Sequence, residues 1–311
     1  MRILVVGAGA TGGYFGGRLL QHGRDVTFLA REKRAAALSK YGLVIHSPAG
    51  DASMPAPPTV LAADLDAPFD LIVLSCKAYG LDQAMDDIIP AVGPDTVILP
   101  LLNGMRQLDL LDARFGAQRV LGGQCVIAAT LDEQGAVRHL NQTHALTYGE
   151  RDGSPSERMQ RITESLGEAG FDARPSATIL QEMWDKWVFL ASLAGITCLM
   201  RGSIGAIVAS PGGEDVTLAL FDECRAVAEG VGHPLSEATR TRARGVLTEA
   251  GSTLTASMLR DLLHGHPIEA DHVIGDMLAR AEHTKEANSM LSAVYAHLKV
   301  YESSRADAQT A

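Results

Sequence analysis

The stretch Gly7-Ala8-Gly9-Ala10-Thr11-Gly12 decides the expected fold, because it lies between a short apolar run, Ile3 to Val6, and a second apolar segment, Tyr14 to Leu20. The spacing G-x-G-x-x-G between a strand and a helix is the fingerprint of a dinucleotide-binding turn. Gly7 would permit the tight turn, Gly9 would let the backbone approach a pyrophosphate, and Gly12 would let the helix pack close to the strand. Free N–H groups at the helix start would face the phosphates. We therefore predict that all six residues bind a cofactor.

The first half of the chain alternates strand-like and helix-like segments around this turn. A helix is expected over residues 31–40 and a loop over the Pro- and Gly-containing residues 47–58. Apolar runs typical of buried strands occupy residues 26–29, 43–46, 71–75, 97–102 and 120–130. Alternating elements with continuous apolar strands predict a parallel sheet with helices on both faces. This pattern predicts an α/β fold whose N-terminal Rossmann domain covers residues 1–175.

The second half of the chain is predicted to be helical. One helix is expected to begin with Ser154 as its N-cap, followed by Pro155 and Glu157 in the first turn. Apolar residues then recur at helical spacing over residues 180–200, 216–229, 237–247 and 274–301. We therefore predict an all-helical C-terminal domain over residues 176–311, with a polar, frayed tail from Ser303 onward.

The composition excludes several classes of protein. The chain has 311 residues, of which 27 are Lys or Arg and 37 are Asp or Glu, so its formal net charge is −10. This balance argues against a nucleic-acid or anionic-membrane partner, because both favour a basic surface. The longest uncharged apolar stretch, Trp187 to Met200, is 14 residues long, whereas a membrane helix needs roughly 20. We read it as a buried core helix and expect no membrane partner.

Cysteine and histidine spacing indicates neither a metal site nor a disulfide framework. The pair in His264-Gly265-His266 is interpreted as part of a loop, since no third ligand is arranged nearby. The four cysteines form no C-x-x-C pair, which fits a reducing cytosol and predicts a cytoplasmic protein without a metal. They are Cys76, Cys125, Cys198 and Cys224.

The end of the second strand predicts the type of dinucleotide. An NAD enzyme usually has Asp or Glu there to bond the ribose hydroxyl, whereas this chain reads Arg31-Glu32-Lys33-Arg34 after residue 30. A guanidinium fits a phosphate dianion, so Arg31 predicts NADP. The alternative is a solvated helix start, and Glu32 would weaken the preference.

Further segments, in their order and spacing, resemble the ketopantoate reductase (2-dehydropantoate 2-reductase) family from Arg2 to about Tyr301. They are Ser75-Cys76-Lys77-Ala78, Leu102-Asn103-Gly104-Met105, Glu182-Met183-Trp184-Asp185-Lys186-Trp187, Ser257-Met258-Leu259-Arg260-Asp261 and Ile268-Glu269-Ala270-Asp271. The resemblance implies a Rossmann domain followed by a helical domain, with the active site in the cleft. It also implies the reduction of a 2-keto acid with NADPH.

The resemblance assigns roles to single residues. Lys186 looks like the catalytic lysine, which would protonate the carbonyl oxygen as hydride reaches the carbon. Burial near two tryptophans would lower its pKa. Asn103 and Glu269 are expected to contact both cofactor and substrate, and Ser257 the substrate carboxylate. Lys77 and, more loosely, Ala129 match cofactor contacts. Without the resemblance, Lys186 is a helix lysine that reaches solvent, and Asn103 is a turn residue.

The sequence departs from the family at two positions on the helix that carries Lys186. The family usually has asparagines four and eight residues after this lysine, where this chain has Leu190 and Ala194. Such a loss of hydrogen-bonding groups favours a more apolar 2-keto acid than ketopantoate. Thr197 lies about 16 Å along the helix from Lys186 and would not replace them.

Three functions remain open at this point. The first is an NADPH-dependent 2-keto acid reductase, which would act in pantothenate biosynthesis if its substrate is ketopantoate. The second is a related hydroxyacid or opine-type dehydrogenase. The third is an NADPH-binding sensor that has lost catalysis. A homodimer is expected only by analogy with similar helical domains.

Overall fold

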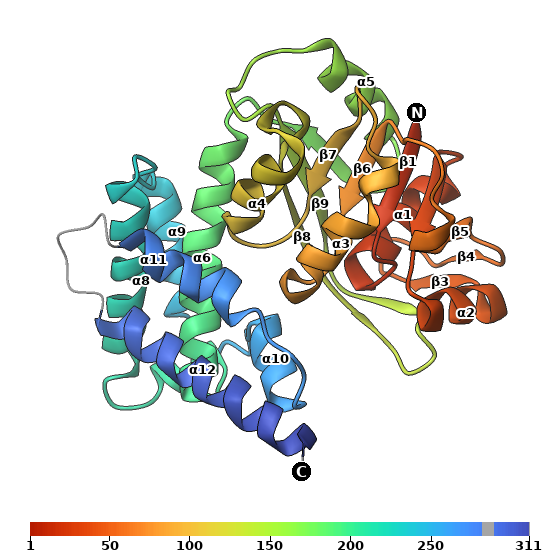
Figure 1. The fold of residues 1–311 in the computed structure, drawn as a ribbon. Coiled ribbons are helices and arrows are strands. Elements are labelled where there is room, and N and C mark those ends of the chain that lie inside the picture. The colour runs from red at the N-terminus through yellow and green to blue at the C-terminus, as the bar shows by residue number, and fades with distance from the viewer. Residues whose placement is uncertain (282–288, 311) are drawn as a thin grey trace. The chain divides into compact units, whose positions relative to one another are not determined.

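A computed structural model describes residues 1–281 and 289–310 of the chain (Figure 1). The chain forms two compact units, one made of residues 1–102 and 107–180 and the other of residues 103–106 and 181–311. The N-terminal unit is α/β and the C-terminal unit is helical, which confirms the predicted fold class.

The first sheet of the N-terminal unit is parallel throughout, in the order β5-β2-β1-β6-β7. The central strand β1 is buried along almost its whole length, since it contributes Ile3, Leu4, Val5 and Val6 to the core. Its strands are β1 (Arg2–Val6), β2 (Asp25–Leu29), β5 (Thr59–Val60), β6 (Leu71–Leu74) and β7 (Val97–Pro100). The helices of this unit are α1 (Ala10–Gln21), α2 (Glu32–Tyr41), α3 (Leu81–Asp87), α4 (Arg106–Phe115) and α5 (Glu157–Leu166). Short 3-10 helices cover Ala62–Asp64, Ala78–Gly80, Ile89–Ala91 and Ala117–Arg119.

A second, mixed sheet was not expected from the sequence. It follows the order β10-β9-β3-β4, with β8 pairing antiparallel to β9. Its strands are β3 (Leu43–His46), β4 (Ala52–Met54), β8 (Gly122–Leu131), β9 (Val137–Gly149) and β10 (Asp172–Pro175). The expected loop over residues 47–58 was therefore wrong in part, because residues 52–54 pair with β3 across a tight connection.

Helix α1 lies between the two sheets, and its glycines make this possible. A Cβ on Gly16 would lie 2.6 Å from the Phe28 ring of the first sheet. A Cβ on Gly17 would lie 2.8 Å from Ile45 of the second sheet. Glycines on both sides of the helix therefore allow close approach to both sheets.

The predicted start of α5 was wrong by two residues. The N-cap is Ser156, whose hydroxyl accepts a hydrogen bond from Met159 N. Ser154 cannot serve because its backbone N–H and its hydroxyl both donate to Asp152 Oδ1, at 3.0 and 2.7 Å.

The helical unit is built around α6 (Ile179–Met200), of which residues from Gln181 onward belong to it. Gly195 of α6 faces Leu220 and Val294, so α6 packs against two other long helices, α8 and α12. The remaining elements are α7 (Ile204–Val208), α8 (Gly213–Gly230), α9 (Glu237–Leu247), α10 (Ser257–Leu263), a π-helix (Asp271–Gly275), α11 (Asp276–Arg280) and α12 (Ser289–Thr310). The helix expected over residues 274–301 thus begins within the π-helix and continues as α11 and α12, and residues 282–288 lie outside the described part.

The expected frayed tail after Ser303 was wrong, because α12 continues to Thr310. Arg305 Nε donates to Gly265 O at 2.9 Å and ties this end of the helix to the loop after α10.

Helix α6 is the one helix in the described residues that is long and apolar enough to cross a membrane by length and composition. Its most apolar window is 67% buried inside the protein, as in the core helix of a globular domain. The interpretation of this segment as a core helix is therefore supported.

Candidate active site

The glycine-rich turn opens onto a cavity of about 590 Å³ in the N-terminal unit. The cavity lies beyond the carboxyl ends of β1, β2 and β6, where parallel α/β sheets bind ligands. Of the residues predicted to bind a cofactor, those that line the cavity are Gly7, Ala8, Gly9, Arg31 and Lys77.

The three glycines of the turn have different surroundings. Gly7 has φ +93°, a conformation that a side chain would strain. A Cβ on Gly12 would lie only 2.1 Å from Gly7 O and from Ser75 Oγ, so the helix start packs directly on the ends of β1 and β6. A Cβ on Gly9 would meet no atom of the described residues within 4 Å. The open space is therefore at Gly9, as the approach of a pyrophosphate requires.

Two cations predicted from the sequence face this cavity. Arg31 is the N-cap of α2, and one of its Nη atoms lies 3.5 Å from the Cβ position of Gly80. Lys77 is the N-cap of the 3-10 helix that contains Gly80. Positive charge thus lies at the end of β2 and at the end of β6, which suits a phosphorylated ligand.

Arg34 is a further residue of this cavity, whose contacts the sequence did not predict. Its Nε donates to Ala8 O at 2.7 Å, and its Nη1 donates to Gly135 O at 2.8 Å. Its remaining nitrogen, Nη2, is buried without a partner among the described residues, and burial lowers the pKa of the guanidinium. Arg34 therefore fixes the carbonyl of the glycine-rich turn. The only signal in the sequence was a third basic residue after β2.

The other predicted cofactor residues of the N-terminal unit do not line the cavity. Ala10, Thr11 and Gly12 form the first turn of α1, behind the lining residues. Ala129 lies on β8 beside a β-bulge, and its neighbour in the cavity wall is Leu131.

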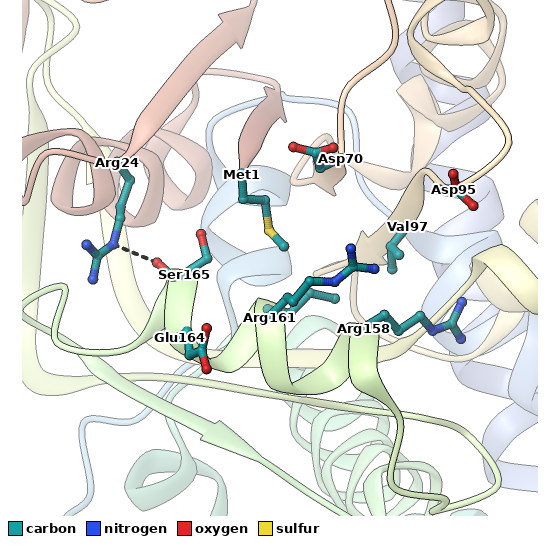
Figure 2. Close-up of a pocket in the computed structure, with 10 residues that line it drawn as sticks. Met1, Arg24, Asp70, Asp95, Val97, Arg158, Arg161, Glu164 and Ser165 are labelled. Carbon is teal, nitrogen blue, oxygen red and sulfur yellow. Dashed lines mark hydrogen bonds between the residues drawn. The ribbon is translucent and has the colours of Figure 1, made fainter.

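A second cavity of about 480 Å³ lies at the opposite, amino ends of the strands of the first sheet, and Figure 2 shows its mixed lining. Arg24 donates to Ser165 O at 2.8 Å, and Arg158 pairs with Glu150. Asp70 and Asp95 add negative charge to the same wall. Because it lies at the amino ends of the strands and holds none of the predicted residues, this cavity is not the candidate cofactor site.

Lys186, in the helical unit, is half-buried on α6 between two buried tryptophans. The rings of Trp184 and Trp187 have centroids 4.9 Å apart. Trp187 Nε1 donates a buried hydrogen bond of 3.0 Å to Val273 O in the π-helix. The two tryptophans next to Lys186 in sequence are therefore buried, and both the apolar setting of the lysine and the lowering of its pKa stay predictions.

The segment that contains Asn103 belongs to the helical unit, although residues on both sides of it belong to the other. Gly104 has φ +87°, and its Cβ position lies 3.1 Å from His272 O and 3.6 Å from Trp187 Nε1. The loop of Asn103 is thereby packed against both α6 and the π-helix.

Glu269 lies two residues before the π-helix, and His272 lies within it. His272 is 6% exposed, and burial lowers its pKa while the charge of Glu269 opposes this shift. π-Helices are uncommon and often mark functional sites. The structure thus brings Asn103, Lys186 and Glu269 into one region of the helical unit. Ser257 is the exposed first residue of α10 in the same unit.

The helix face beyond Lys186 is apolar. Leu190 is half-buried and Ala194 is 6% exposed. The hydroxyl of Thr197 donates to Leu193 O of its own helix at 2.6 Å. It is therefore engaged within α6, in agreement with the expectation that it does not replace Leu190.

Metal binding finds no support in the described residues, where no group of three or more His, Cys, Asp or Glu side chains is arranged to hold an ion. His264 and His266 are exposed after α10, with rings 5.8 Å apart, as expected of a loop. The four cysteines are free thiols, and burial raises the pKa of Cys198 and Cys224 to about 12.

The glycine-rich turn lies at the carboxyl end of the central strand, and basic residues lie beside it. Together with the helical C-terminal unit, these features define the class of protein, a two-domain nicotinamide-dependent oxidoreductase. Residues 3–153 match the family described as "Ketopantoate reductase PanE/ApbA", and residues 178–302 match its C-terminal domain. The chain belongs to the ketopantoate reductase PanE/ApbA family.

Relatives extend over nearly the whole chain. An uncharacterized oxidoreductase, YkpB of Bacillus subtilis (strain 168), is 37% identical over 98% of this chain and 100% of its own length. A 2-dehydropantoate 2-reductase of Mesorhizobium japonicum is 30% identical over 88% of this chain and 89% of its own length.

Solved structures show the same fold. A 2-dehydropantoate 2-reductase from Geobacter metallireducens GS-15 aligns with a TM-score of 0.87 at 26% identity, over 96% of this chain and 99% of that one. A D-mandelate dehydrogenase, solved with NADH and anilino(oxo)acetate, aligns with a TM-score of 0.87 at 20% identity. That alignment covers 98% of this chain and 99% of the other, and at this identity it shows a common fold only.

Proposed function

We propose that the protein reduces a 2-keto acid to the 2-hydroxy acid with NADPH, with Lys186 as the general acid. The observation that carries the proposal is the grouping of Asn103, Lys186 and Glu269 around Trp187 and the π-helix. Gly104, Trp187 and His272, which are neighbours of the three residues in sequence, pack together in the helical unit. This packing supports a common site, because a carbonyl-reducing site needs a proton donor and substrate-binding groups close together.

The chemistry follows from the residue types. A bound nicotinamide supplies a hydride to the carbonyl carbon, and the oxygen then needs a proton donor. The Lys186 ammonium would donate that proton and become a neutral amine. Asn103 and Glu269 would orient the substrate by hydrogen bonds to its oxygens. Ser257 would bind the carboxylate.

The residues of the first cavity fit a phosphorylated dinucleotide. The space over Gly9 would accept the pyrophosphate, and Arg34 bonds the carbonyl of the turn beside it. Arg31 and Lys77 would bind the additional phosphate that distinguishes NADP from NAD. These features support NADP as the preferred cofactor.

The apolar face of α6 determines the proposed substrate class. Leu190 and Ala194 offer no hydrogen bond to a hydroxyl-bearing side chain. We therefore expect ketopantoate or, in preference, a 2-keto acid with a more apolar side chain. If ketopantoate is the substrate, the enzyme serves pantothenate biosynthesis. We also expect a homodimer in the cytoplasm, where free cysteines stay reduced.

The test is NADPH oxidation with ketopantoate and a panel of apolar 2-keto acids. Lys186→Ala should abolish turnover and leave NADPH binding intact, because the cofactor cavity lies in the other unit. The matched control, Lys40→Ala, removes an exposed lysine at the end of α2 and should leave turnover unchanged. Tight NADPH binding without turnover of any acid would refute the proposal and favour a sensor.

A further inference from the structure

The loop that carries Asn103 is built into the helical unit from two sides. Residues 103–106 group with that unit, whereas Leu102 and Gln107 group with the other. One local contact spans the loop, since Gln107 Nε2 donates to Leu102 O at 3.3 Å. Contacts from the helical unit add to it on two sides.

The first contact comes from α6. Trp187 follows Lys186 directly, is 1% exposed, and uses its indole N–H on Val273 O at 3.0 Å. The same nitrogen lies 3.6 Å from the Cβ position of Gly104. Trp187 thus occupies the corner between the lysine helix, the π-helix and the loop.

The second contact comes from His272 in the π-helix. Its ring makes a hydrogen bond to the Asn103 backbone, and this bond favours the protonated ring. The ring is therefore the donor and the Asn103 carbonyl is the acceptor. His272 Cδ2 also lies 3.4 Å from the Cβ position of Gly104, so the ring contacts two consecutive residues of the loop.

We propose that His272 is a positioning residue, which fixes the Asn103 loop against the π-helix and so sets the amide of Asn103 relative to Lys186 and Glu269. The packing requires a glycine at position 104, because any side chain would meet His272 and would strain a φ of +87°. The consequence for turnover rests on the proposed function, whereas the consequence for the loop does not.

The loop is tested first, by hydrogen exchange of the backbone amides in a peptide that covers residues 101–107. His272→Phe keeps a buried ring but removes the donor, so exchange should rise about tenfold. His272→Gln retains an N–H donor and should restore much of the protection. His266→Phe, an exposed histidine of the loop after α10, is the control and should leave exchange unchanged.

Kinetics then separate positioning from a general loss of structure. With the acid that the wild-type protein turns over, His272→Phe should lower kcat about tenfold and His272→Gln much less. The Kd for NADPH should change much less than kcat, because most of the predicted cofactor contacts are in the other unit.

Gly104→Ala provides the same test from the loop side if His272→Phe does not fold. Unchanged exchange of residues 101–107 in both His272→Phe and Gly104→Ala would overturn the proposal, as would equal effects of Phe and Gln at position 272. A wild-type protein without turnover would refute the proposed function alone, since the exchange experiment still decides the role of His272.

Discussion

A pair of alanine substitutions in the glycine-rich turn separates folding from cofactor binding. Gly12→Ala places a Cβ 2.1 Å from Gly7 O and from Ser75 Oγ, whereas Gly9→Ala places one in open space. The two changes add the same methyl group three residues apart. We expect the first to destabilise the N-terminal unit and the second to leave it stable but weaken its binding of NADPH.

The size of the first effect follows from the contacts. A Cβ does not approach closer than 3.0 Å, so the turn must move by about 1 Å. Ser75 Oγ already donates to Val6 O and Gly7 O, and its displacement strains both bonds. Overpacking of this kind costs about 1–3 kcal/mol, a lost hydrogen bond about 1 kcal/mol, and alanine returns about 1 kcal/mol of helix propensity. The net loss is about 2 kcal/mol, or a Tm lower by about 4–8 °C.

Gly9→Ala should behave differently on both counts. Gly9 has φ −78° and ψ −159°, which alanine adopts without strain, so the Tm should stay within about 2 °C of the wild type. Its methyl group would fill the space expected for the pyrophosphate, so the Kd for NADPH should rise at least about tenfold.

Differential scanning calorimetry and NADPH fluorescence titration measure the two quantities. A Gly9→Ala protein that binds NADPH as tightly as the wild type would show that the phosphates lie elsewhere. A Gly12→Ala protein with the wild-type Tm would refute the contact argument.

Three further predictions concern other parts of the chain. Arg31→Asp should raise the Kd for NADPH about 10- to 100-fold and leave the Kd for NADH unchanged. Lys33→Asp makes the same charge change outside the cavity and should alter neither Kd. Titration with each cofactor measures both dissociation constants. The Glu223 carboxylate accepts hydrogen bonds from Met290 N and Leu291 N at 3.0 and 2.8 Å. Glu223→Ala should therefore lower the Tm by a few degrees in calorimetry. Glu229→Ala removes an exposed ion pair with Arg225 and should leave the Tm unchanged. Arg158 lowers the pKa of Glu150 in the folded protein, so Glu150 stabilises the fold above the ordinary glutamate pKa of about 4.3 and loses this effect as the pH falls below it. The Tm difference between wild type and Glu150→Gln should therefore shrink in acid, and a difference independent of pH would contradict this assignment.

Local patterns in the sequence predicted the parts of the fold that depend on near neighbours. The β1–turn–α1 unit follows from an apolar run and the spacing of glycines, and α9 begins and ends where its periodicity predicts. Strand β9 (Val137–Gly149) was not predicted, because its first half carries polar and charged residues and its partners are distant in sequence. Its order depends on pairing with β8, β3 and β10, which no local pattern encodes.

The same limit applies to the candidate site. Asn103, Lys186 and Glu269 could be nominated one by one, since each matches a short motif. The residues that connect them could not, because their contacts join distant segments: Trp187 and Val273 are 86 positions apart. A histidine beside Glu269 carries no local signal of the carbonyl that it bonds, and Gly104 reads as an ordinary turn glycine.

Positions 190 and 194 of α6 can change substrate specificity separately from the proposed chemical groups. The loop of Asn103 packs on the buried side chains of Trp187 and His272, whereas Leu190 and Ala194 lie farther along α6. A substitution at position 190 or 194 alters what the helix face offers to a substrate side chain without touching the bond from Trp187 to the π-helix. Restoring asparagine at both positions should therefore shift preference toward a hydroxyl-bearing 2-keto acid such as ketopantoate, through KM more than kcat. An equal loss of kcat for every acid would show instead that this face and the proposed proton donor are not separable.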